Sequence, residues 1–199
     1  MPIAPFLLLI YLFCPGHTLQ DGKSSVSLWV ISGDGSLKVG GRTNINKFSC
    51  SITNLLSPDT IMFVKDFSLE KIKMSGSIQL DIKRFNCNNA VMTKDLRRTL
   101  KADEFPRMRI RFISLGWYPE SSVKSNAVAG VVLISLAGIT KKFDVNYTVI
   151  HKGANMMLLK GMRTITFSDF NIIPPGKLGG MVKTHNALDV EFNLGLVQL

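Results

Sequence analysis

Hydrophobic and polar residues alternate one by one along much of this chain. In the segment 71–82, lysine, serine, glutamine and aspartate take the odd positions, and the apolar residues fall on even ones: Ile72, Met74, Ile78, Leu80 and Ile82. Because successive side chains of a strand point to opposite faces, this pattern predicts one long strand with an apolar and a solvated face. Gly76 interrupts the apolar face, so we expect a bend or bulge there.

The same period recurs and predicts a mainly β protein. We expect strands over residues 107–112, 142–149 and 188–196, and weaker ones over 25–31, 37–43, 48–53, 127–136 and 156–167. Ala137-Gly138 is typical of a tight hairpin turn between two strands. Residues 88–102 instead place Val91, Met92, Leu96 and Leu100 on one helical face, with Asn88 or Asn89 as the N-cap. Polar outward faces favour antiparallel pairing, in a sandwich or a closed barrel with one helix.

The first residues form an apolar run that is too short to span a bilayer. Phe6 to Phe13 are all hydrophobic, and a run of this length is typical of the apolar core of a secretory signal. No lysine or arginine precedes the run. We therefore expect residues 1–20 to be a signal peptide and residues 21–199 to be a single exported domain. This places the mature protein in the periplasm or outside the cell. A buried N-terminal strand is the alternative interpretation of the run.

Composition and motifs narrow the function. The chain has 199 residues, 46% hydrophobic and 19% charged, as expected for a globular domain. Its net charge of +10 favours anionic partners, but export and the lack of interleaved aromatic residues argue against nucleic acid. Zinc-ribbon, zincin, P-loop, dinucleotide and nucleophile-elbow motifs are absent, and His151 and His185 are isolated. We expect no enzyme activity, no metal and no cofactor, with Asp169 bonding turn amides rather than acting as a catalytic acid.

Two cysteines remain if Cys14 leaves with the signal, namely Cys50 and Cys87. An oxidising compartment favours a disulfide between them, which would contribute roughly 3–4 kcal/mol to stability in the chain-entropy picture. Two buried free thiols that pack as small hydrophobic side chains are the alternative.

Four segments resemble, in the same order, segments of YceI-like proteins. They are GRTNINKFSC (41–50), FNCNNAVM (85–92) with its following LKA and FP, AGITK (137–141), and ITFSDFNI (165–172). Asn171 stands where the family pattern has glycine, and residues 56–64 look like an insertion. The resemblance covers nearly the whole mature chain. It implies an exported, antiparallel, eight-stranded lipocalin-like barrel whose lumen holds a polyisoprenoid or a related long-chain lipid.

The inward positions of such a barrel are apolar and would suit an alkyl or isoprenyl chain, since each buried CH₂ contributes about 0.8 kcal/mol. The lining that we predict is Ile72, Met74, Ile78, Leu80, Met108, Ile110, Phe112, Val132, Ile134, Phe143, Val145, Tyr147, Phe192 and Leu194. This predicts a carrier, storage or sequestering protein. The same residues could instead pack as a dry core, which would make the chain a ligand-free structural or interaction module of the cell envelope.

Charge is concentrated around the predicted helix. Nine basic and three acidic residues lie between Lys83 and Arg111. A basic rim of this kind could meet an anionic lipid head group, with Arg97 and Arg98 as the candidate contacts, or an anionic membrane surface. A solvated outer face is the alternative interpretation, and it fits Arg107, Arg109 and Arg111 better because they alternate along a strand. Dimerisation is also possible.

Overall fold

The chain folds into twelve strands, one α-helix and three short 3-10 helices within the residues that the computed structural model describes, 24–55, 59–66, 71–116 and 125–199. The strands are β1 (Ser24–Ile31), β2 (Ser36–Thr43), β3 (Lys47–Thr53), β4 (Thr60–Asp66), β5 (Ile72–Ser75), β6 (Ser77–Asp81), β7 (Arg107–Leu115), β8 (Ser125–Leu136), β9 (Ile139–His151), β10 (Met156–Thr166), β11 (Gly176–Lys177) and β12 (Val182–Gln198). The helices are η1 (Ile82–Arg84), α1 (Ala90–Thr99), η2 (Phe167–Phe170) and η3 (Leu178–Gly180). The predicted signal peptide, residues 1–20, lies outside the described residues. Within the described part of the chain, no helix has the length and apolar character needed to cross a membrane.

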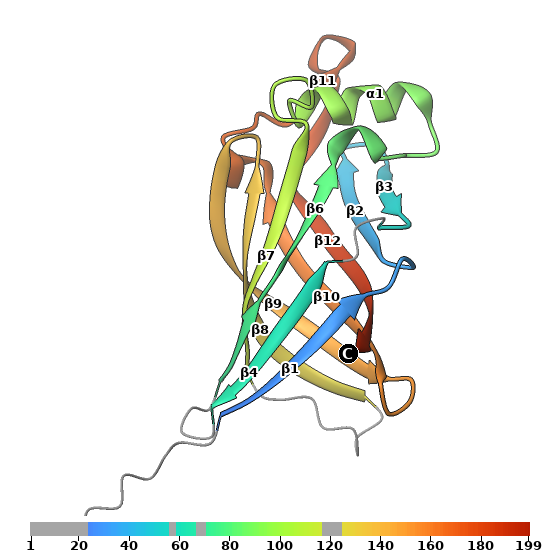
Figure 1. The fold of residues 1–199 in the computed structure, drawn as a ribbon. Helices are drawn as coiled ribbons and strands as arrows, with labels where there is room; N and C mark the ends of the chain where they lie inside the picture. Colours follow the sequence, from blue (N-terminus) through green and yellow to red (C-terminus); the bar gives the residue numbers. More distant parts are fainter. Residues whose placement is uncertain (1–23, 56–58, 67–70, 117–124) are drawn as a thin grey trace, which may run out of the picture.

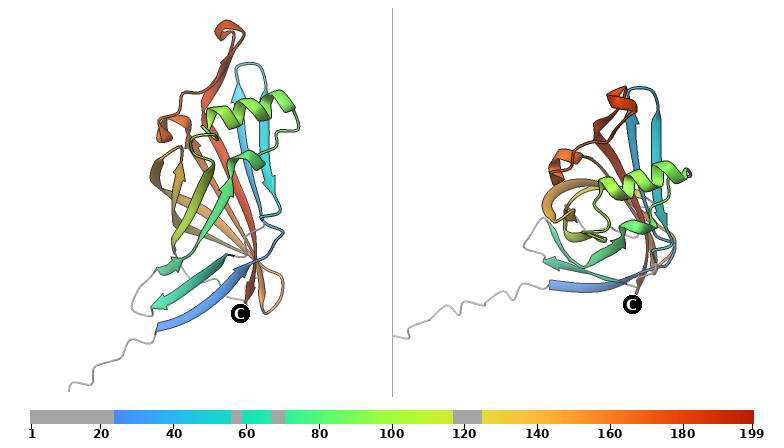
Figure 2. Two further views of the ribbon diagram at one scale, coloured as in Figure 1. Left: turned by 45° about the horizontal axis from the view of Figure 1, so that its top comes forward. Right: turned by 90° about the horizontal axis from the view of Figure 1, so that it is seen from above.

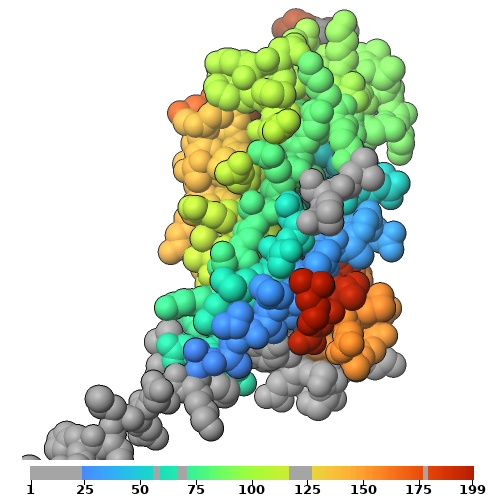
Figure 3. Space-filling model, viewed as in Figure 1, coloured from blue at the N-terminus to red at the C-terminus, as the bar shows by residue number. Residues whose placement is uncertain are grey.

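Eight strand positions close into a ring in the order β1, β4, β5, β7, β8, β9, β10 and β12, and β12 pairs back onto β1 (Figure 1). All of these pairings are antiparallel. The ring closes where Trp29 lies opposite Gln198, and Figure 3 shows the end of β12 (red) against β1 (blue). The antiparallel eight-stranded barrel expected from the sequence is therefore confirmed.

The long strand β12 changes partner along its length, which opens the wall at one end. Its last residues pair with β1, whereas residues 184–193 pair with β2, and β2 pairs with β3. An isolated bridge between Ser51 and Asn86 then links β3 to the chain beyond η1. At this end of the molecule, β2 and β3 thus extend the wall, and α1 crosses it near them (Figure 2).

Strand β4 corrects the interpretation of residues 56–64 as an insertion. It runs from Thr60 to Asp66 between β1 and β5, so part of that segment is wall. The two-residue period of β4 is not visible in the sequence because residues 61–64 are all apolar. In the structure only Ile61 and Phe63 of these four are fully buried, so they form the inner face of the strand. The predicted bend at Gly76 is present, with φ of 143° between β5 and β6. A Cβ there would press on the Thr60 carbonyl oxygen, so the close approach of β4 requires glycine.

Local sequence signals account for the turns and the helix. Ala137 and Gly138 both have positive φ, 48° and 78°, as the tight hairpin between β8 and β9 requires. Asn89 is the N-cap of α1, and its Oδ1 accepts a hydrogen bond from the Met92 amide at 2.9 Å. The helix is shorter than the predicted 88–102, and Val91 is 63% exposed, so it does not share the buried face of α1 with Leu96.

Candidate functional site

The fourteen side chains predicted to line the lumen are all buried. They come from β5, β6, β7, β8, β9 and β12, and the exposed fraction of each is below one tenth: Ile72, Met74, Ile78, Leu80, Met108, Ile110, Phe112, Val132, Ile134, Phe143, Val145, Tyr147, Phe192 and Leu194. The inward assignment follows from the two-residue period alone.

Three of these side chains meet across the interior. The ring centroid of Phe192 lies 5.7 Å from that of Tyr147 and 6.0 Å from that of Phe112, both edge-on. Two inward glycines make room for the rings, because a Cβ on Gly161 would overlap Phe192 and one on Gly130 would overlap Tyr147. The barrel is filled with aromatic rings at this level.

The Tyr147 hydroxyl is the polar atom of this aromatic layer. It is buried, and it has no hydrogen-bond partner among the described residues. Burial raises the pKa of the Tyr147 phenol, so the group is neutral at physiological pH. It is a donor enclosed by apolar neighbours.

An apolar hollow of about 250 Å³ lies between α1 and the upper parts of β2, β3 and β12. Its apolar wall includes Ile45, Phe48, Cys50, Met92, Leu96, Phe167, Pro175 and Val182, and its polar wall is Thr43, Asn46, Asp95, Thr99 and Thr184. Of these residues, Cys50, Leu96 and Phe167 are fully buried and connect the hollow to the core. The hollow therefore lies beside the first residues of β12, at the end of that strand where its partner is β2 and not β1.

The α1 wall of the hollow is attached to the barrel at several points. A disulfide joins Cys50 on β3 to Cys87, just before the helix. The Thr93 Oγ1 accepts from the Cys87 amide at 3.0 Å, and the Arg97 Nη2 donates to the Phe85 carbonyl at 3.0 Å. These contacts fix the distance between the helix and β3, and hence the width of the hollow.

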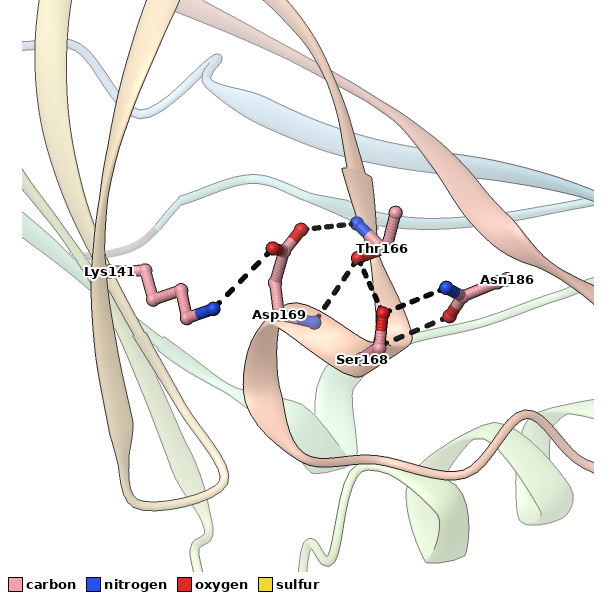
Figure 4. A network of polar contacts seen from close by, with 5 residues as sticks. All are labelled: Lys141, Thr166, Ser168, Asp169 and Asn186. Carbon is pink, nitrogen blue, oxygen red and sulfur yellow. Dashed lines mark hydrogen bonds and ion pairs between the residues drawn. The ribbon is translucent and has the colours of Figure 1, made fainter.

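The η2 wall is held by the polar network in Figure 4. The Thr166 amide donates to the Asp169 Oδ2 at 2.7 Å, and the Asp169 amide donates to the Thr166 Oγ1 at 3.1 Å, so the two residues form a capping box. Lys141 on β9 contributes an ion pair at 3.6 Å. Asn186 on β12 exchanges hydrogen bonds with Ser168 at 2.8 and 3.1 Å. Asp169 is therefore a capping residue that positions Phe167 against the hollow.

Electrostatics around Asp169 fit this structural role. Partial burial alone would raise the pKa of its carboxyl, but the hydrogen bonds from Thr166 and the Lys141 ammonium outweigh burial and lower that pKa. Asn171, which ends η2, has φ of 52°, a left-handed conformation that asparagine tolerates. The substitution of the family glycine at this position therefore fits the local backbone.

The two candidate head-group residues lie on different sides of α1. Residues 92, 95, 96 and 99 face the hollow, whereas Arg97 faces a basic depression of about 680 Å³ that Lys83, Arg84 and Lys94 also line. At 100° per residue these two surfaces are on opposite faces of the helix. The Arg98 Nη2 instead pairs with the Asp95 Oδ1 at 2.9 Å, and Asp95 lines the hollow. Arg98 is thus nearer the hollow than Arg97.

Side chains that could bind a metal ion are not clustered in the described part of the chain. Across residues 24–55, 59–66, 71–116 and 125–199, no group of three or more His, Cys, Asp or Glu side chains is placed to hold a metal ion.

A family model for the YceI-like domain matches residues 19–196, which is most of the chain. The protein belongs to the YceI-like family. The family resemblance read from the four sequence segments is therefore confirmed. Comparison with curated proteins returned no significant match.

Solved structures of low sequence identity share the fold of this YceI-like domain. BcnA of Burkholderia cenocepacia is 14% identical, with a TM-score of 0.58 over 81% of this chain and 95% of that one. A polyisoprenoid binding domain from Saccharophagus degradans, implicated in plant cell wall breakdown, is 10% identical, with a TM-score of 0.58 over 85% of this chain and 97% of that one. At these identities the comparison supports the architecture.

No sequence pattern in this YceI-like domain points to the hollow. Phe48 and Cys50 were expected in a strand, with Cys50 as a candidate for the disulfide, and Met92 and Leu96 were placed on one helical face, but nothing in the pattern joined these two sets of residues around a hollow. The helical period does show that Met92 and Leu96 share a face, but no sequence pattern states which strands that face would meet.

Proposed function

We propose that this YceI-like domain is an exported, non-enzymatic protein that binds the apolar chain of an isoprenoid or similar lipid and carries, stores or sequesters it. The observation that supports the proposal most directly is the apolar hollow beneath α1, which joins the surface to the buried core at the end where the wall opens. The fold shared with a polyisoprenoid binding domain is a second support.

The volume of the hollow limits what it holds as it stands. A cavity of about 150 Å³ accommodates benzene, so 250 Å³ corresponds to roughly ten carbon atoms, or two isoprene units. Burial of ten carbons contributes about 8 kcal/mol, and association costs a large part of that. Tight binding therefore needs a longer chain.

A longer chain has to continue into the barrel, where the fourteen inward residues would line its path. The Phe112, Tyr147 and Phe192 rings stand across that path, so the chain would have to displace them. An anionic head group would remain outside, near Arg98 at the rim, whereas Arg97 lies on the far side of α1. The protein would take up and release the ligand at an anionic membrane surface. A dimer is compatible with the proposal.

The filled aromatic layer favours one alternative. If the rings never move, the barrel is a ligand-free structural or interaction module of the cell envelope. The tight seating of Phe192 over Gly161 supports this alternative.

Solvent extraction of the purified mature protein followed by mass spectrometry tests the proposal. A stoichiometric lipid is the expected result. Uptake of isoprenols of ten, fifteen and twenty carbons then separates the two functions, because affinity that rises with each added isoprene unit requires the interior to open. Protein that is empty on isolation and takes up none of these alcohols would support the ligand-free module.

A pair of variants on one helix locates the site. Met92→Trp fills the hollow and should abolish uptake, whereas Val91→Trp adds the same ring at an exposed position and should leave uptake unchanged. Equal uptake by the two variants would show that the ligand does not use the hollow.

A further inference from the structure

Two turns project together at the end of the molecule that carries α1 (Figure 2). They are the β2–β3 turn, residues 44–46, and residues 179–183, which run from the end of η3 into the first residues of β12, and we call them the tip. The Asn44 Nδ2 donates to the Met181 carbonyl at 2.8 Å, and the Lys183 amide donates to the Asn44 Oδ1 at 3.0 Å. The Asn44 amide also donates to the Lys183 carbonyl at 3.0 Å. These bonds make the tip one unit rather than two independent loops.

The tip presents large apolar side chains to solvent. Ile45 is 68% exposed and Met181 is 71% exposed. Each has a small or polar residue beside it in the sequence, so the turns themselves do not require a large apolar side chain at these positions. Exposed apolar side chains at the end of two joined turns, next to an apolar hollow, mark an interaction surface.

The charge of the tip indicates which kind of surface it would bind. No aspartate or glutamate occurs in residues 40–58 or in residues 170–188, a stretch on each side of both turns. Arg42, Lys47 and Lys183 lie beside the turns and are exposed. Exposed apolar side chains flanked by cations, in two segments that contain no carboxylate, match a bilayer surface that contains anionic phospholipids.

The tip and the hollow share a wall. Ile45 and Val182 both line the hollow, and Thr43 and Thr184, which pair across β2 and β12, line it between the turns and the barrel. A tip seated on a bilayer would therefore bring the mouth of the hollow to the lipid surface.

We propose that the tip docks this protein on anionic bilayers, with Ile45 and Met181 inserted among the acyl chains and Arg42, Lys47 and Lys183 at the level of the phosphates. The docked protein exchanges its lipid between the hollow and the bilayer. This last step rests on the proposed lipid-binding function, whereas docking itself does not.

Vesicle cosedimentation with matched variants tests docking. The wild-type protein should bind vesicles of phosphatidylcholine with one third phosphatidylglycerol, and bind pure phosphatidylcholine vesicles at least tenfold more weakly. Met181→Asp should reduce binding to the anionic vesicles at least tenfold. Met162→Asp, which makes the same change at a 59% exposed methionine on the barrel wall, should bind like the wild type. Equal binding by the two aspartate variants overturns the proposal.

The cations have their own test. Each basic side chain near an anionic surface contributes roughly fivefold in affinity. Lys47→Gln with Lys183→Gln should therefore weaken binding to the anionic vesicles roughly twenty-fivefold and flatten its dependence on salt. An unchanged affinity contradicts the placement of these cations at the phosphate level.

Two further measurements separate the possible failures. Met181→Asp should still take up farnesol dispersed in buffer without vesicles, because Met181 does not line the hollow. If no variant takes up farnesol but the vesicle difference persists, the lipid-binding function fails and docking stands. Sedimentation velocity without lipid checks for self-association, and a dimer that Met181→Asp abolishes would assign the tip to a second copy of this chain and overturn the membrane proposal.

Discussion

The disulfide between Cys50 and Cys87 offers the sharpest test of how the open end of the barrel is held. It spans 37 positions of the sequence and joins β3 to the residues before α1. Beside it, Ser51 and Asn86 exchange two backbone hydrogen bonds at 2.8 and 2.9 Å. The perturbation is removal of the bond, by the double substitution Cys50→Ala with Cys87→Ala or by reduction of the wild-type protein.

Loop length sets the expected magnitude. A cross-link over a loop of this length removes chain entropy from the unfolded state that corresponds to about 4 kcal/mol at 25 °C. For a domain of this size, each kcal/mol shifts the melting temperature by about 2–4 °C, so loss of the bond should lower it by roughly 8–16 °C. The alanine variant should fall slightly further than the reduced protein, because Cys50 and Cys87 are both buried and their sulfur atoms fill space.

Differential scanning calorimetry of the oxidised, reduced and double-alanine proteins measures these shifts. Amide hydrogen exchange adds a local readout, since the Ser51 and Asn86 amides should lose protection before the strands of the ring do. Thiol labelling of denatured, non-reduced protein verifies that the bond is present at the start. A fall of less than about 2 °C in the reduced protein would refute the reasoning, because it would mean that the loop is already constrained when the chain is unfolded.

Three further substitutions test the site and the interior. Asp169→Asn should destabilise the protein by about 1 kcal/mol at pH 7. Since folding lowers the pKa of the Asp169 carboxyl, its contribution is present above the unfolded value of about 3.9 and is lost as the pH falls through the folded value, so thermal melting of the two proteins should converge in acid. Gly161→Ala should cost about 1–3 kcal/mol in urea unfolding because its Cβ would overlap the Phe192 ring, whereas Gly33→Ala, with no atom within 4 Å of its Cβ, should cost far less. Tyr147→Phe removes a buried hydroxyl without a partner among the described residues, so urea unfolding should show equal or higher stability, and a loss of more than about 1 kcal/mol would reveal a hydrogen bond to that hydroxyl.

Local sequence signals predicted the turns and the helix cap correctly. The β8–β9 turn needed two residues with positive φ, and Ala137-Gly138 supplied them. Gly76 was recognised as a break in a strand, and Asn89 as one of two possible caps. Strand β4 was missed because its consecutive apolar residues carry no period, and only burial shows that Ile61 and Phe63 are its inner face.

The sequence by itself determined which side chains point inward, because the period of two holds for a strand whatever its neighbours are. It also determined which family the chain belongs to. Only the tertiary structure decided how much room those side chains leave. Gly130 and Gly161 carry no inward side chain, yet the Tyr147 and Phe192 rings fill their places from other strands. The hollow likewise forms where α1 fails to close on β2, β3 and β12. A cavity is the space that remains after side chains from distant parts of the chain have filled an enclosed volume, so no local pattern of residues can predict its position.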